Sequence, residues 1–141
     1  MSTTPTLEKL LQDSGLAEKA QVLEQNLIRL QWGSAFVIVG VSGSAIVAIA
    51  PLFRELPKDK VNDFYRKLLE HNAYMGGMAS FAIQPDGWVI LHSGRALKGM
   101  DAGEFANMVA GVGRFADQFD DQLIHEFYVD QPEATNQATV Q

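Results

Sequence analysis

The chain has 141 residues, of which 47% are hydrophobic and 20% charged, a balance that suits one soluble globular domain. Its formal net charge is −6 and its 11 Lys and Arg side chains are scattered, so no nucleic-acid partner is expected, because phosphate binding needs clustered cations. No apolar run approaches the roughly 20 residues of a membrane span, and without cysteine the chain can form no disulfide.

A short first helix is predicted near the N-terminus. The segment 1–5 lacks the basic start and apolar core of a signal peptide, which favours a cytoplasmic location. Leu7, Leu10 and Leu11 then have helical spacing. Gly15 is placed to end this helix in a left-handed conformation.

A β-rich segment follows between residues 22 and 51. We expect three strands here, at about 28–32, 34–41 and 44–50, with a two-residue turn at Ser42–Gly43. Alternation makes both faces of the hairpin at 34–50 apolar, with Phe36, Ile38, Val47 and Ile49 on one face and Val37, Val39, Ile46 and Ala48 on the other.

Two apolar faces are unexpected in a sheet that helices cover on one face only. Either another subunit, another chain or the first helix covers the second face. The alternative is a sheet closed on both faces by the protein's own helices.

A middle helix and a second hairpin come next. The helix is predicted to follow Pro57 and to end at Gly76–Gly77. Two strands, 78–84 and 88–93, are then joined by Pro85-Asp86-Gly87. If Gln84 pairs with Trp88, one face is core and the other has the mixed composition of an interface. The apolar stripe of the helix is Val61, Phe64, Tyr65, Leu68, Leu69, Asn72 and Met75.

The chain closes with a long amphipathic helix, from Asp101 to about Tyr128. Asp101 and Glu104 have capping-box spacing, and Met100 and Phe105 that of a hydrophobic staple. The apolar stripe spans an arc of about 120°, which predicts a helix laid on a sheet. Gly111 and Gly113 weaken this helix, so we expect a kink, close helix-on-sheet packing, or close approach of a partner backbone at Gly113.

These elements predict an α+β fold of the order α-β-β-β-α-β-β-α, with a largely antiparallel sheet and helices packed on one face. We expect one domain over residues 1–129 and a disordered tail over 130–141.

Catalytic chemistry is not expected. His71, His92 and His125 have no second His or Cys at metal-ligand spacing, so neither a metal nor a cofactor is predicted. The segment 40–44 lacks the final glycine of a nucleophile elbow. The acidic side chains of the last helix, Asp117, Asp120, Asp121 and Glu126, are interpreted as a solvated face.

In this order of elements the chain resembles the class I type III secretion chaperones, the CesT or Tir-chaperone family, and their YbjN-like relatives. The matching features are the leucine-rich first helix and the segments 48–51, 68–72, 81–83, 86–91 and 104–105. The resemblance covers about residues 5 to 128.

This resemblance implies a non-enzymatic homodimer that binds an extended segment of a protein cargo or effector. The alternatives are a YbjN-like regulatory or scaffolding dimer that binds folded proteins, and, less favoured, a small-molecule binder around His92, Arg95 or Asn72. We expect cargo contacts at Leu7, Leu10, Ile28, Leu30, Trp32 and Phe36, and dimer contacts at Phe64, Leu68, Met75, Met78, Trp88 and Ile90.

Overall fold

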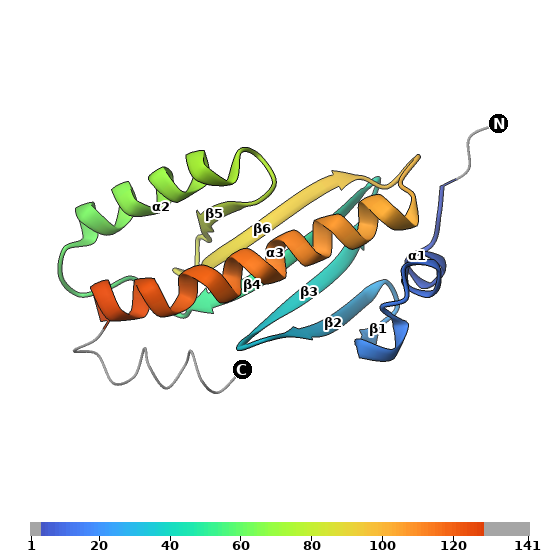
Figure 1. The fold of residues 1–141 in the computed structure, drawn as a ribbon, viewed down its shortest axis with the longest axis horizontal. Helices are drawn as coiled ribbons and strands as arrows, with labels where there is room; N and C mark the ends of the chain where they lie inside the picture. The colour runs from blue at the N-terminus through green and yellow to red at the C-terminus, as the bar shows by residue number, and fades with distance from the viewer. Residues whose placement is uncertain (1–3, 129–141) are drawn as a thin grey trace.

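The computed structural model describes residues 4–128 as one antiparallel sheet with helices on one face (Figure 1). This arrangement confirms the predicted α+β fold class. The expected tail over 130–141 lies outside the described residues. The helices are α1 (Leu7–Ser14), α2 (Val61–Met75) and α3 (Ala102–Leu123), with a 3₁₀ turn at Ala17–Lys19 and a π-helical turn at Ile124–Tyr128.

The sheet has six strands in the order β1-β2-β3-β4-β6-β5, and every neighbouring pair is antiparallel. Four strands precede α2, whereas the sequence predicted three. The strand that the prediction missed is β1. Only two of the five β1 residues are strongly apolar and the strand is largely exposed, so its pattern is weak. The strands are β1 (Ala20–Glu24), β2 (Leu27–Trp32), β3 (Ala35–Ser42), β4 (Ala45–Phe53), β5 (Ser80–Ile83) and β6 (Val89–Ala96).

The predicted turns and hairpin registers are present, with one shift. Gln84 N donates to Trp88 O at 2.9 Å, which confirms the pairing across the second hairpin. In the first hairpin Ser42 pairs with Ala45, so the turn is Gly43–Ser44 and lies one residue later than expected. Ile38 therefore pairs with Ile49 and not with Val47, and this shift of two residues leaves the assignment of side chains to the two faces unchanged.

Helix boundaries follow the capping residues. Gly15 and Gly76 end α1 and α2 in left-handed conformations, with φ of 79° and 63°. Asp101 caps α3 by accepting from Glu104 N at 2.7 Å. Only half of the predicted capping box forms, because the Glu104 carboxylate faces Arg95 at 3.5 Å.

The core lies between α3 and one face of the sheet. α3 crosses β3, β4 and β6, while α1 packs against α3 and α2 packs on β5 (Figure 1). The first helix therefore does not cover the second sheet face. The buried strand residues on the core face include Ile28, Leu30, Ala35, Val37, Val39, Ile46, Ala48, Ala50, Phe81, Val89 and Leu91.

Gly113 lets α3 approach the sheet closely. A Cβ atom at this position would overlap the indole ring of Trp32, at the end of β2. Close helix-on-sheet packing therefore explains this glycine, and the close neighbour is a side chain of the same chain. Gly111 is also buried, but its nearest neighbour would be Met78 Cε at 4.0 Å.

A small polar cluster fixes the β2–β3 turn to α3. Ser34 Oγ lies 2.8 Å from both Asp117 Oδ1 and Asp120 Oδ2, and Ser34 N donates to Asp117 Oδ1 at 3.1 Å. A hydroxyl has only one hydrogen, so both contacts form when a protonated Asp120 donates to Ser34. The expected solvated face is thus wrong for Asp120, which is 7% exposed.

The two carboxyl groups of this cluster, Asp117 and Asp120, have pKa values that are shifted in opposite directions. Burial raises the pKa of Asp120 above its ordinary value of 3.8, and the carboxylates of Asp121 and Asp117 add to the shift. The hydrogen bonds from Ser34 instead lower the pKa of Asp117. The two carboxyl groups therefore titrate in different pH ranges.

Replacing the two helix glycines separates packing from propensity. We expect Gly113→Ala to lower the free energy of unfolding by about 1–3 kcal/mol, because the new methyl group collides with Trp32. Gly111→Ala should raise it by up to about 1 kcal/mol, since alanine favours the helix and meets no close neighbour. Urea denaturation measures both. Equal effects of the two substitutions would contradict this account.

The substitution Asp120→Asn should stabilise the protein at pH 7. The amide keeps an acceptor for Asp121 N, can donate to Ser34 and carries no charge. Because the folded pKa of Asp120 is raised, the wild type loses stability as pH rises from about 4 through that pKa. The gain should therefore disappear below pH 4, whereas the same gain at pH 3.5 and pH 7 would contradict a proton on Asp120.

Candidate protein-binding surfaces

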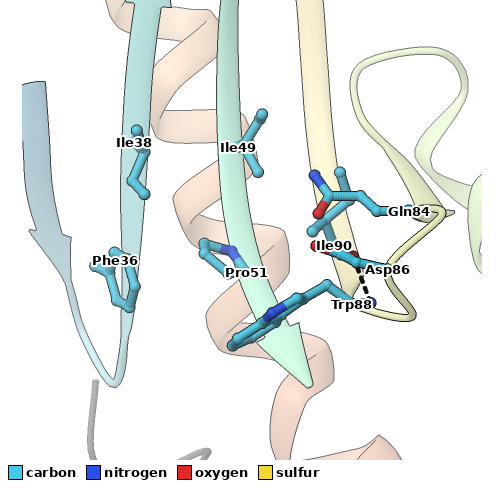
Figure 2. Close-up of a pocket in the computed structure, with 8 residues that line it drawn as sticks. All are labelled: Phe36, Ile38, Ile49, Pro51, Gln84, Asp86, Trp88 and Ile90. Atoms are coloured by element: carbon cyan, nitrogen blue, oxygen red, sulfur yellow. Dashed lines mark hydrogen bonds between the residues drawn. The ribbon is translucent and has the colours of Figure 1, made fainter. Parts of the chain in front are cut away.

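The sheet face opposite α3 is apolar and carries a hollow of about 360 Å³ (Figure 2). Phe36 and Ile38 project from β3, Ile49 and Pro51 from β4, and Ile90 from β6, while the helix lies behind the sheet. Strand alternation produces this face, because the intervening residues point into the core. The lining is completed by Gln84, Asp86 and Trp88.

A second hollow of about 360 Å³ continues the first. The two share Ile38 and Ile49, so together they form one depression across β2, β3, β4 and β6. We call it the open groove. The second hollow is lined by Glu24, Gln25, Asn26, Leu27, Ile38, Gly40, Val41, Ser42, Val47 and Ile49.

Arginine side chains lie over two aromatic rings of the open groove. The guanidinium carbon of Arg29 lies 4.2 Å from the centre of the Phe36 ring, and that of Arg54 lies 5.9 Å from the Trp88 ring. Cation–π contacts of this kind hold aromatic rings in place. The Asp86 carboxylate accepts from Trp88 N at 3.1 Å and fixes the turn beside the ring.

A separate apolar surface lies between α2 and β5, which we call the α2–β5 surface. It contains a hollow of about 240 Å³ whose rim includes Tyr65, Leu69 and Ile83. Leu69 is 68% exposed, although it belongs to the predicted apolar stripe of α2. That stripe therefore divides, with Phe64, Leu68 and Met75 in the core and Tyr65 and Leu69 outside it.

The outer edge of the sheet at β1 is a third apolar feature. Val22 is 71% exposed and Leu23 is 45% exposed, and Leu23 lies at a β-bulge between Val22 and Glu24. Exposed apolar side chains on an edge strand favour pairing with another strand, whereas a bulge limits such pairing.

The six predicted cargo residues lie in three different environments. Leu7, Leu10, Ile28 and Leu30 are buried in the core, so their side chains are already covered. Trp32 is half-buried against Gly113. Of this set, Phe36 lines the open groove.

The six predicted dimer residues are also divided. Phe64 and Met75 are buried, Leu68 lines the hollow of the α2–β5 surface, and Met78 is 46% exposed beside Gly111. Trp88 and Ile90 line the open groove together with Phe36. The structure thus joins in one hollow residues that the sequence analysis assigned to two different surfaces.

Several residues of these surfaces were absent from the predicted sets. Ile38, Val47 and Ile49 were recognisable from strand alternation as an apolar second face. Leu69 was recognisable from its place on the helix stripe, but its exposure was not. Val22 and Leu23 belong to the strand that the sequence analysis missed.

The three polar residues considered for a small-molecule site, Asn72, His92 and Arg95, do not line a common hollow. Asn72 is hydrogen bonded to the β5 backbone and Arg95 faces Glu104, so neither is directed at a common ligand site with His92. The described residues contain no group of three potential metal ligands, and none of their helices is both long and apolar enough to cross a bilayer.

His71 is packed between helices. Its ring stacks on Phe119 with centroids 4.1 Å apart, and its Nε2 is buried without a hydrogen-bond partner. Burial lowers the pKa of His71, and the nearby Lys67 charge adds to this effect. The neutral ring therefore serves as part of the α2–α3 packing.

These features define a small α+β protein in which the helices of the described residues cover one sheet face and not the other. The chain belongs to the Tir chaperone protein (CesT) family, whose sequence profile matches residues 6–118. This is a family of type III secretion chaperones, which are not enzymes. No curated protein sequence matches the chain.

Solved structures of chaperone complexes have the same fold. The HopA1–SchA chaperone–effector complex matches with a TM-score of 0.61 and 11% identity, covering 81% of this chain and 92% of the other. The ExsC–ExsE complex matches with a TM-score of 0.60 and 13% identity, covering 84% and 96%. ExoU–SpcU of the Pseudomonas aeruginosa type III secretion system matches with a TM-score of 0.58 and 12% identity, covering 72% and 85%.

Proposed function

We propose that this protein is a cytoplasmic, homodimeric chaperone that holds an apolar segment of a protein cargo for type III secretion. The observation that carries the proposal is the open groove, an apolar sheet face that none of the described helices covers. An exposed apolar groove with a polar rim is typical of protein-binding surfaces.

The groove binds through side chains and not through backbone hydrogen bonds. Backbone groups in the middle of the sheet are already paired with neighbouring strands. A cargo segment on this face must therefore satisfy its own backbone, which favours an amphipathic helix. An extended segment can instead join the free edge of β1, where Val22 and Leu23 are exposed.

Phe36 and Trp88 are the proposed anchors of the open groove. Both rings are half-buried and both are covered on one side by an arginine. Large aromatic side chains held in place in this way lose little conformational entropy on binding and are common binding hot spots.

The α2–β5 surface is the proposed contact between two copies. Leu69, Tyr65 and Ile83 form a patch around a shallow hollow, and the open groove lies on the other side of the sheet. A dimer formed here leaves the open groove of each copy available to cargo. We therefore assign dimerisation to α2 and β5, and cargo binding to β2, β3, β4 and β6.

Substitution in the open groove should remove cargo binding without unfolding the protein. We expect Phe36→Asp or Ile49→Asp to weaken binding at least 10-fold, about 1.4 kcal/mol or more, because each places a charge in an apolar contact. The control Gln118→Asp puts the same residue on the exposed side of α3. Co-purification from the native cell followed by titration of the recovered partner measures the change.

The form of the bound partner separates the two candidate functions. Limited proteolysis of the complex should protect a short cargo segment, because a secretion chaperone masks an unfolded region. Protection of an entire folded domain would favour the regulatory or scaffolding dimer instead. Equal binding by Phe36→Asp and Gln118→Asp would reject the groove as the site.

Substitution on the α2–β5 surface should produce a monomer. Leu69→Glu places a carboxylate in the proposed contact, and light scattering should show half the wild-type mass at micromolar concentration. Tyr74→Glu is the matched control, because Tyr74 is 71% exposed on the flank of α2 that faces α3. If Tyr74→Glu were monomeric and Leu69→Glu dimeric, the dimer contact would lie on the Tyr74 side of α2, which would contradict the proposed α2–β5 contact.

A further inference from the structure

The first hollow of the open groove has an aromatic ring on each side of β4. Phe36 projects from β3 and Trp88 directly precedes β6, while Pro51 of β4 lies between them (Figure 2). Because β3, β4 and β6 are neighbours in the sheet, the two rings are separated by two strand spacings, or about 10 Å. A partner that contacts both rings must therefore cross β4.

A guanidinium group lies over each of these rings. The guanidinium carbon of Arg29 is 4.2 Å from the centre of the Phe36 ring, and that of Arg54 is 5.9 Å from the centre of the Trp88 ring. Contact with a ring uses the flat face of a guanidinium group, whereas its five N–H groups point outward in its plane. One arginine can therefore cover a ring and also donate to a carboxylate of a partner.

The charge at this end of the groove differs in sign from that of the whole chain. The formal net charge is −6, yet two cations lie over the rings of the first hollow. Within residues 4–128, the charged residue that lines this hollow is Asp86, and its carboxylate accepts from Trp88 N at 3.1 Å. The charged residue that lines the second hollow is Glu24. The groove is therefore polarised, with its positive end at the two rings.

We infer that the open groove selects cargo helices that carry two carboxylates about two helical turns apart, one for Arg29 and one for Arg54. This inference rests on the proposed function and adds the chemistry of the cargo. Helix residues seven positions apart lie on the same side and are separated by about 10.5 Å, which matches the spacing of the rings. Arg29 and Arg54 thus determine specificity, while Phe36 and Trp88 supply the apolar anchors.

Two synthetic peptides test this selection on the full chain. Both are amphipathic helices of about 16 residues with one leucine face, about 24 Å long. The first has two glutamates seven positions apart at the border of that face, and the second has glutamines at the same positions. Fluorescence anisotropy of the labelled peptides measures their affinities.

The glutamate peptide should bind about 5-fold more tightly than the glutamine peptide at low ionic strength, since two exposed charge pairs form. Added salt, at about 0.5 M, should remove most of this difference because it screens exposed charges. Equal affinities of the two peptides at low ionic strength would overturn the inference. The same result would follow if neither peptide bound.

Neutral variants of the two arginines separate recognition of a carboxylate from positioning of the rings. Methionine keeps an unbranched apolar side chain beside each ring and carries no charge. The double variant Arg29→Met, Arg54→Met should therefore bind the glutamate peptide only as well as the wild type binds the glutamine peptide. Its affinity for the glutamine peptide should stay within about 2-fold of the wild-type value. An equal loss for both peptides would show that the arginines only hold the rings, which would overturn their role in selection.

A control variant removes a cation elsewhere on the surface. Arg66 lies on α2, where its side chain is 82% exposed and pairs with Glu70 at 3.1 Å. Arg66→Met should leave the affinities for both peptides unchanged, and circular dichroism shows whether each variant is folded. A loss of preference for the glutamate peptide in Arg66→Met would indicate a general effect of charge and would overturn the assignment to Arg29 and Arg54.

The substitution Phe36→Asp distinguishes failure of this inference from failure of the proposed function. We expect it to weaken both peptides and the co-purified partner, because it removes an anchor that all of them use. Loss of the partner together with equal affinities of the two peptides would reject selection by charge and keep the groove as the binding site. Unchanged binding of the peptides and the partner by Phe36→Asp would reject both.

Discussion

The packing of α3 against one face of the sheet is the interaction on which the rest of the structure depends. This helix covers the core residues of β3, β4 and β6, and its close approach requires the absence of a side chain at Gly113. Because α1 and α2 pack around α3 and not on the opposite face, none of the helices within residues 4–128 covers the second apolar face. The same arrangement that forms the core thus creates the open groove.

Much of the fold could be predicted because local signals and strand alternation agree. Asp101 and Gly15 mark helix ends, and the turn at 85–87 sets the second hairpin. β1 escaped prediction because an exposed edge strand needs no regular apolar pattern. The apolar stripe of α2 was recognisable, but periodicity does not show that Leu69 and Phe64 face different neighbours.

The surfaces were harder to predict than the fold, because the sequence does not distinguish an apolar residue of the core from an apolar residue of a binding site. Leu30 and Phe36 were both expected at the cargo site, yet Leu30 is buried and Phe36 lines the open groove. Contacts between distant positions are invisible in one sequence. Ser34 meets Asp117 and Asp120 across more than 80 residues, and Asn72 caps a strand that follows it.

Polar contacts complement the apolar surfaces by deciding which parts of the sheet stay accessible. An open groove and an exposed edge increase the risk of self-association, since both can bind another copy. On β5, the Asn72 side chain is hydrogen bonded to the backbone C=O and N–H of Phe81, and the net charge of −6 opposes indiscriminate association. A chaperone of the proposed kind must keep this groove available to cargo, and net charge limits self-association without covering the groove.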